Sequence, residues 1–127
     1  MSQIEKENPK YDLEERTAKF GESIIVFCRE VKYNPTVSPL INQLVRSATS
    51  IGANYMEANG ASSKKDFINK IFICKKEAQE TKHWLRMLSS ALPEKADVLR
   101  VFWKEAQELT LIFQKISSTA RKGTENK

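Results

Sequence analysis

Residues 46–88 read RSATSIGANYMEANGASSKKDFINKIFICKKEAQETKHWLRML, and this segment holds the strongest structural signal in the chain. Its second half carries apolar or small side chains in alternating steps of four and three: Phe67, Ile71, Cys74, Ala78, Thr81, Leu85 and Leu88. Such spacing places them on one helical face, and a period close to 3.5 favours packing against another helix at a shallow angle. Ser63 and Asp66 match a capping box with aspartate replacing glutamate. The sequence therefore predicts a long helix over residues 63–91.

Three further helices are predicted around this one. The four predicted helices are residues 11–33, 38–60, 63–91 and 93–120. The first stops before Asn34-Pro35, because proline disfavours helix at the residue before it. Ser38 and Pro39 fit the N-cap and first helical position of the second, which ends near Gly60.

Short connections between long helices make sequence neighbours antiparallel. We therefore expect an all-α fold, an antiparallel up-down-up-down four-helix bundle over residues 11–120. A chain of 127 residues is long enough for one such domain with a core of its own. The tails, residues 1–10 and 121–127, are expected to be flexible.

Composition points to a soluble protein. No run approaches the roughly 18 apolar residues of a membrane span, and the N-terminal residues are polar and charged. We therefore expect a cytoplasmic location and no membrane partner. Cys28 and Cys74 fall on different predicted helices, and two isolated cysteines form neither a disulfide framework nor a metal site. Both are predicted to be small buried apolar residues.

The sequence also resembles a known family over residues 11–120. The segments that carry the resemblance are RSATSIGAN at 46–54, EANG at 57–60, SKKDF at 63–67, KEAQET at 76–81 and Trp84-Leu85. They are similar to the bacterial four-helix bundle protein family, also called the 23S rRNA intervening-sequence protein family. That family is related to the accessory bundle protein of diversity-generating retroelements. The resemblance implies a ring-shaped homopentamer, a link to RNA through genomic setting, and no established enzymatic activity.

No catalytic or cofactor site is predicted. Glu80 and His83 have the Glu-x-x-His spacing that di-iron bundles use, but such a centre needs the motif twice and two further glutamates. His83 is the only histidine in the chain, so one subunit lacks the ligands. Glycine-rich phosphate loops, Ser-His-Asp sets and zinc spacings are absent from the sequence as well. We therefore expect a protein that is not an enzyme and holds no metal or cofactor.

A polar stripe follows one face of the second predicted helix. Its members are Gln43, Arg46, Ser50, Asn54 and Glu57. They could form a solvated face, or a hydrogen-bonded network at a subunit contact in which Arg46 pairs with Glu57 or Glu77 of a neighbouring copy. Small residues beside the stripe would permit the close helix approach that the second interpretation needs.

Three apolar residues lie off the main stripes. Ile68 and Phe72 on the third helix and Trp103 on the fourth are about 90° to 140° from their helix's apolar stripe. A wide monomeric core could absorb them. Otherwise their exposure favours oligomerisation, and they become subunit-interface candidates together with four residues of the polar stripe, Arg46, Ser50, Asn54 and Glu57.

Charge gives the last functional signal. Residues 62–88 hold seven basic and three acidic residues, which is most of the net charge of +5. Repetition around a ring would favour binding to RNA or DNA, with Lys64, Lys65, Lys75 and Lys82 as the predicted contacts. Two functions stay open. One is a homo-oligomer that binds nucleic acid or a nucleic-acid-processing protein, and the other is a structural or adaptor oligomer without a nucleic-acid role.

Overall fold

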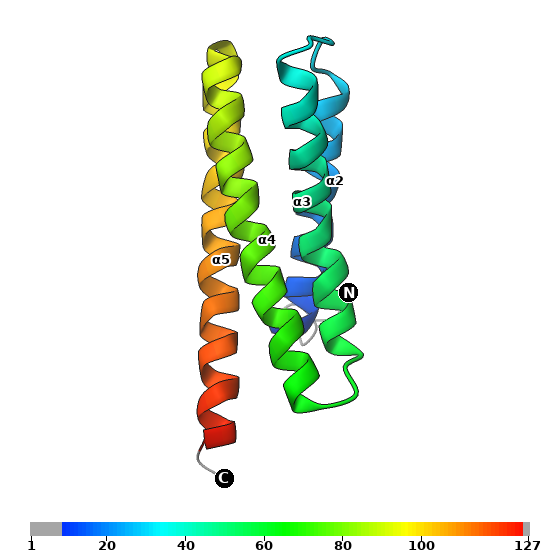
Figure 1. Ribbon diagram of the computed structural model, residues 1–127, viewed down its shortest axis with the longest axis vertical. Coiled ribbons are helices and arrows are strands. Elements are labelled where there is room, and N and C mark those ends of the chain that lie inside the picture. The colour runs from blue at the N-terminus through cyan, green and yellow to red at the C-terminus, as the bar shows by residue number, and fades with distance from the viewer. Residues whose placement is uncertain (1–8, 126–127) are drawn as a thin grey trace.

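The computed structural model describes residues 9–125, and within that range the chain forms four α-helices, one short 3-10 turn and no strand. The elements are α2 (Pro9–Arg29), α3 (Val37–Asn59), α4 (Lys64–Ala91), η1 (Pro93–Lys95) and α5 (Ala96–Glu125). Consecutive helices run in opposite directions, with α5 on one side of the view, α2 and α3 on the other, and α4 crossing from beside α5 at the top to beside α3 at the bottom (Figure 1). The predicted all-α four-helix bundle is confirmed.

The apolar stripe of α4 packs as its spacing predicts. Six of its seven residues, from Ile71 to Leu88, are buried, and Phe67 is half-buried. The predicted cap is also present, since Ser63 Oγ accepts a hydrogen bond from the backbone N–H of Asp66 at 3.0 Å. Local sequence chemistry and tertiary packing therefore agree along this helix.

The connection between α2 and α3 differs from the prediction. α2 ends at Arg29 rather than at residue 33, because the next two amides bond to carbonyls only three residues back, as in a 3-10 turn. Ser38 is not the N-cap of α3, which begins at Val37. Instead Asn34 Oδ1 accepts a hydrogen bond from the N–H of Thr36 at 2.8 Å, so an asparagine turn leads the chain into the helix.

Both ends of the bundle are more helical than predicted. α2 begins at Pro9, where a missing amide is tolerated because the first helical N–H groups have no partner within the helix. α5 continues to Glu125, through most of the segment 121–127 that we expected to be a flexible tail. Residues 1–8 of the other expected tail, and residues 126 and 127, lie outside the described range.

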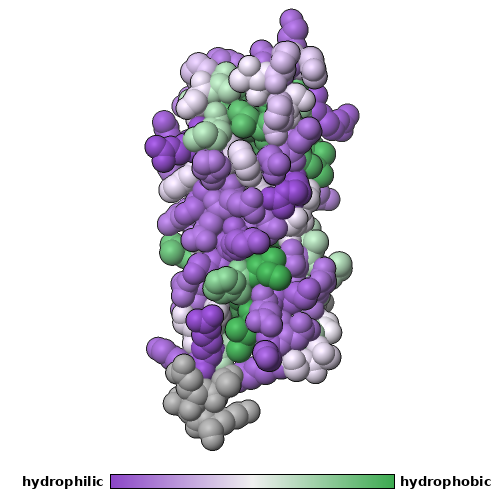
Figure 2. Space-filling model, in the orientation of Figure 1, coloured by the Kyte–Doolittle hydropathy of each residue, from purple (hydrophilic) through white to green (hydrophobic). Residues whose placement is uncertain are grey.

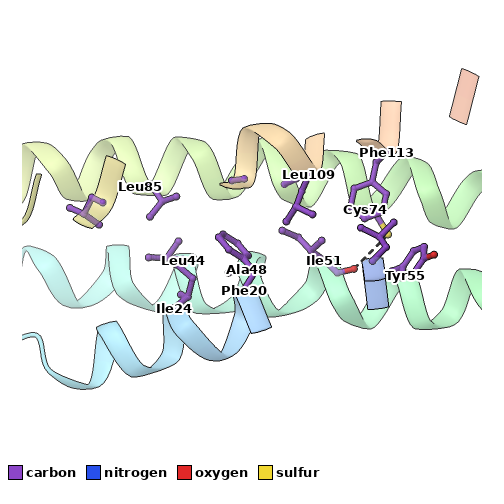
Figure 3. Close-up of a cluster of buried hydrophobic side chains, with 14 of the residues drawn as sticks. Phe20, Ile24, Leu44, Ala48, Ile51, Tyr55, Cys74, Leu85, Leu109 and Phe113 are labelled. Atoms are coloured by element: carbon purple, nitrogen blue, oxygen red, sulfur yellow. Dashed lines mark hydrogen bonds between the residues drawn. The ribbon is translucent and has the colours of Figure 1, made fainter. Parts of the chain in front are cut away.

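One apolar core joins all four helices (Figure 3). Its largest fully buried side chains include Ile24 of α2, Leu44 of α3, Leu85 of α4 and Phe113 of α5. The ring of Phe113 lies 5.9 Å from that of Tyr55, centroid to centroid, and so ties α5 to α3. Because these side chains are fully buried, removing any of them would leave an internal cavity between helices.

The contact between α2 and α5 is looser than the other contacts between neighbouring helices. Long side chains bridge it: the rings of Phe20 and Phe27 lie edge-on to Phe102, at centroid distances of 6.5 and 5.6 Å. Arg16 of α2 donates from Nε and Nη2 to the two carboxylate oxygens of Glu105 at 2.7 and 2.8 Å. Long side chains thus hold α2 and α5 together although their backbones do not pack closely.

Candidate functional site

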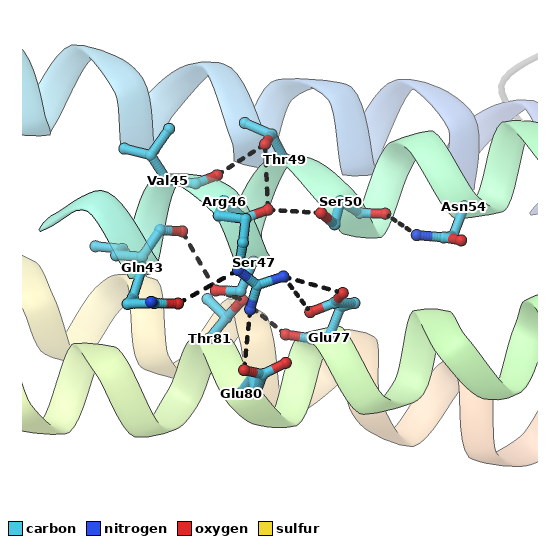
Figure 4. Close-up of polar contacts among 11 residues, drawn as sticks. Gln43, Val45, Arg46, Ser47, Thr49, Ser50, Asn54, Glu77, Glu80 and Thr81 are labelled. Atoms are coloured by element: carbon cyan, nitrogen blue, oxygen red, sulfur yellow. Dashed lines mark hydrogen bonds and ion pairs between the residues drawn. The ribbon is translucent and has the colours of Figure 1, made fainter. Parts of the chain in front are cut away.

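A cluster of charged side chains crosses from α3 to α4 (Figure 4). Arg46 Nη1 lies 3.3 Å from Glu77 Oε2, Arg46 Nη2 donates to Glu80 Oε1 at 2.9 Å, and Arg46 Nε donates to Gln43 Oε1 at 3.3 Å. The pairing expected between Arg46 and Glu77 therefore exists, but within one chain rather than between two copies. The surface over α3 and α4 is mostly hydrophilic around it, with small hydrophobic patches (Figure 2).

Two buried hydroxyls lie beside this cluster, and their contact could not be predicted from the spacing of residues along either helix. Ser47 Oγ of α3 and Thr81 Oγ1 of α4 are 2.9 Å apart, and neither side chain is exposed to solvent. Each is also within hydrogen-bond distance of a carbonyl of its own helix. Because the pair satisfies its polar atoms internally, it specifies the register of α3 against α4.

The two carboxylates of the cluster have unequal proton affinities. Burial raises the pKa of Glu77, and its hydrogen bond to Glu80 raises it further, while Arg46 acts in the opposite direction. Burial also acts to raise the pKa of Glu80, but hydrogen bonds from Glu77 and Arg46 outweigh it, so that pKa lies below its usual value. Glu77 is thus the more readily protonated of the two carboxyl groups, and Glu80 is the main counter-ion of Arg46.

The rest of the polar stripe also finds partners inside the chain. Ser50 Oγ donates to the carbonyl of Arg46 at 2.6 Å, and Asn54 Nδ2 donates to the carbonyl of Ser50 at 2.8 Å. Glu57 accepts from Lys70 Nζ of α4 at 2.7 Å. The proposed role of these residues in a subunit contact stays a prediction, and Ser50 and Asn54 are its best probes because their side chains bond only to their own helix.

Two of the predicted nucleic-acid contacts and two of the predicted subunit-interface residues lie together on the surface of α4 and α5. Lys75 Nζ lies 5.6 Å from the ring centroid of Phe72, and Lys82 Nζ lies 5.4 Å from that of Trp103. The same two lysines donate to Gln114 and Gln107 of α5. Phe72 and Trp103 are 48% and 38% exposed, so the core does not absorb them. A partner that covered these rings would therefore also cover the two lysines.

Lys64 and Lys65 have a different setting in the first turn of α4. Both side chains are exposed, and neither has an ion-pair partner among the side chains of residues 13–123, the part of the chain whose side chains are described. Lys64 Nζ approaches the last turns of α5 near Gly123, where an added Cβ would lie 3.0 Å from it. Exposed Arg121 and Lys122 of α5 belong to the same end of the bundle. Ile68, one turn further along α4, is half-buried.

Glu80 and His83, which have the Glu-x-x-His spacing of a metal site, make other contacts in the structure. Glu80 binds Arg46, and the ring of His83 packs edge-on to Trp84 at a centroid distance of 4.9 Å. In the described part of the chain, no three His, Cys, Asp or Glu side chains gather as a metal site. Across the same residues no helix is both long and apolar enough to traverse a bilayer.

Both cysteines are free thiols, and the structure corrects one of the two burial predictions, since Cys74 is buried but Cys28 is only half-buried. Burial raises the pKa of Cys74 to about 12 and that of Cys28 to about 11. Because the thiolate is the reactive form, we expect folded Cys74 to resist iodoacetamide near pH 8 and to react after unfolding in urea. Rapid alkylation in the folded protein would contradict this assignment.

The same shifts predict how stability depends on pH. The unfolded thiols ionise near their ordinary pKa of 9.0 while the folded ones stay protonated, so stability should fall as pH rises above that value. Urea unfolding of Cys74→Ala should show a shallower decline than the parent protein.

The fold defines a four-helix bundle protein. Its charged cluster lies between α3 and α4, and its exposed rings and lysines lie on α4 and α5. The family described as 23S rRNA-intervening sequence protein matches residues 10–115, and the chain belongs to that family. A similar solved structure is that of a protein with unknown function from the S23 ribosomal protein family of Bacteroides thetaiotaomicron. It is 30% identical, the TM-score is 0.73, and the match covers 82% of this chain and 96% of that one. A comparison with curated proteins finds no similar sequence.

Proposed function

We propose that this chain is a non-catalytic, homo-oligomeric bundle that binds RNA or DNA, or a protein that processes them, through a basic surface. The observation that carries the proposal is the concentration of positive charge on α4 and the end of α5. Residues 62–88 hold seven basic residues against three acidic ones, and Arg121 and Lys122 adjoin that segment.

The first turn of α4 is the best-supported contact region. Lys64 and Lys65 are exposed there, and they can reach a phosphate without disturbing the core. The N–H groups of a helix N-terminus add a favourable field for anions. Phosphate binding of this kind releases counterions and is not sequence-specific.

Assembly into a ring of about five copies is the second part of the proposal. Exposed apolar side chains on α2, α3, α4 and α5 support self-association, and the copy number follows the family resemblance. We expect light scattering to give about five times the chain mass of 14.6 kDa. A mass that stays at one chain over a wide concentration range would contradict assembly.

A structural or adaptor oligomer without a nucleic-acid role is the alternative, and one observation favours it. Lys75 and Lys82 are already held by glutamines and aromatic rings of their own chain, which reduces their availability to phosphates. In that case the basic surface would serve solubility or an acidic protein partner.

A titration of single-stranded and duplex RNA and DNA at several salt concentrations tests the nucleic-acid role. Changing Lys64 and Lys65 to glutamine should weaken binding at least tenfold and reduce the log–log salt slope by about one for each lysine. Adding Lys75→Gln and Lys82→Gln measures whether those two residues contribute.

The matched control removes two positive charges elsewhere. Lys19 of α2 and Lys32 in the following loop are exposed and outside the basic cluster, so changing both to glutamine should leave the slope nearly unchanged. If the parent protein does not bind at low salt, or both double variants weaken binding equally, the adaptor function replaces the proposed one.

A further inference from the structure

A groove of about 360 Å³ runs between α2 and α3 on the outer side of that helix pair. Small residues form its floor, with Ala18 and Gly21 on α2 opposite Gly52 and Ala53 on α3. Its lining is otherwise completed by Glu14, Thr17, Glu22, Ile25, Thr49 and Met56. The only charged residues in this lining are glutamates, and the groove is therefore apolar at its base and acidic at its rim.

The opposite helix pair presents the complementary chemistry. We call the set Phe72, Lys75, Lys82, Trp103 and Arg121 the α4–α5 ridge, because half-exposed rings alternate there with cations. A hollow of about 400 Å³ beside Trp103 continues it, and the charged groups lining that hollow are Arg86, Arg100 and Lys104. The ridge thus offers apolar rings surrounded by positive charge.

We propose that the α2–α3 groove of one copy receives the α4–α5 ridge of the next copy, head to tail. This inference rests on the proposed assembly and adds which two surfaces form each contact. Insertion of Phe72 or Trp103 would bury apolar surface against the small residues of the groove. The lysines beside those rings would then lie near Glu14 and Glu22 of the neighbouring copy, where opposite charges favour and orient docking.

Charge disfavours the symmetrical alternatives. A contact of groove with groove brings glutamates together, and a contact of ridge with ridge brings lysines and arginines together. Only the mixed contact pairs opposite charges, so the interface joins two different patches. A docked pair therefore keeps one free groove and one free ridge, to which further copies can add. Such a contact generates a closed ring or an open filament, depending on the rotation between copies. In Figure 1, α5 lies on the side of the bundle opposite α2 and α3, and α4 crosses between them.

Two complementary blocked variants test the inference. Ala53→Arg places a long cation in the groove, and Phe72→Asp removes a ring of the ridge and adds the wrong charge. Both positions are exposed in the single chain, so circular dichroism and urea unfolding should match those of the parent at low concentration. Asn69→Arg adds the same charge at an exposed site of α4 outside both patches and serves as the control.

Each blocked variant alone should remain at the chain mass of 14.6 kDa, whereas the control should assemble like the parent. An equimolar mixture should form a species of twice the chain mass and nothing larger, because the two chains together retain one intact groove and one intact ridge. If either variant assembles alone, or if the mixture stays monomeric or rebuilds the parent oligomer, the pairing is wrong. Ala18→Arg and Trp103→Asp repeat the test if a first variant loses helicity.

The outcomes separate this inference from the proposed assembly. A monomeric parent overturns both, whereas an oligomeric parent whose blocked variants still assemble overturns only the pairing of faces. Reversing the charges at the proposed contact is an independent test. Glu22→Lys and Lys82→Glu should each weaken assembly at low salt. The variant that carries both changes should assemble like the parent. Lack of recovery in that variant contradicts a contact between these two charges.

Discussion

Replacement of Phe113 by alanine should lower the free energy of unfolding by about 3 to 5 kcal/mol. The side chain is fully buried, and its ring packs against Tyr55 of α3 from its place on α5. Truncation removes the transfer free energy of the ring and leaves a cavity that the closely packed helices around it can collapse only in part. Since small domains are stable by only about 5 to 15 kcal/mol, this variant should be close to unfolding at moderate temperature.

Urea unfolding followed by circular dichroism measures the effect. Val101→Ala is the control on the same helix, because Val101 is 65% exposed and its truncation should change stability by no more than about 0.5 kcal/mol. Equal losses in the two variants would show that the α5 face assigned to the core is not buried.

Replacement of Arg46 by leucine should cost about 2 kcal/mol at neutral pH. The change removes the cation between Glu77 and Glu80, and the Glu77 side chain is only 10% exposed, so a nearly buried carboxylate loses its partner. Arg46 itself is 46% exposed, which keeps the expected loss below that of a fully buried ion pair. Glu77→Gln should be far milder, because it removes a carboxylate that is costly to ionise while keeping an acceptor for Arg46.

The cost of Arg46→Leu should depend on pH. The pKa of Glu77 is raised in the folded chain, so its charged form disfavours folding, and stability falls as pH rises through the range between the unfolded and folded values. Without Arg46 that pKa rises further, so the variant should lose less stability in mild acid, where Glu77 is protonated and can donate to Glu80. Combining Arg46→Leu with Glu77→Gln should recover part of the loss, and strictly additive effects would contradict the coupling.

The helices of this protein could be predicted because their signals are local. The α4 stripe and the Ser63 cap depend only on residues within a few positions of each other, and both appear as expected. The start of α3 was missed because two neighbouring signals competed. Ser38-Pro39 suggested one N-terminus, while the side chain of Asn34 turned the chain slightly earlier.

The candidate site was only partly predictable, because it depends on the register between helices. The polar stripe on α3 was visible, but its spacing did not reveal that Arg46 would meet Glu77 and Glu80 of the same chain. Phe72 and Lys75 are three positions apart on one helix, so their contact was within reach of sequence reasoning. The contact of Lys82 with Trp103 joins two helices, and only the fold brings it about.

The loose edge between α2 and α5 divides the bundle into unequal parts. α3, α4 and α5 are joined by two close helix contacts in succession, whereas α2 is held closely along α3 alone. Cooperativity should therefore be strongest among the last three helices, and α2 is the element that can open by local unfolding while the remainder stays folded. Since α2 forms one wall of the groove proposed to receive a second copy, docking of that copy would clamp the helix that the isolated chain holds least firmly.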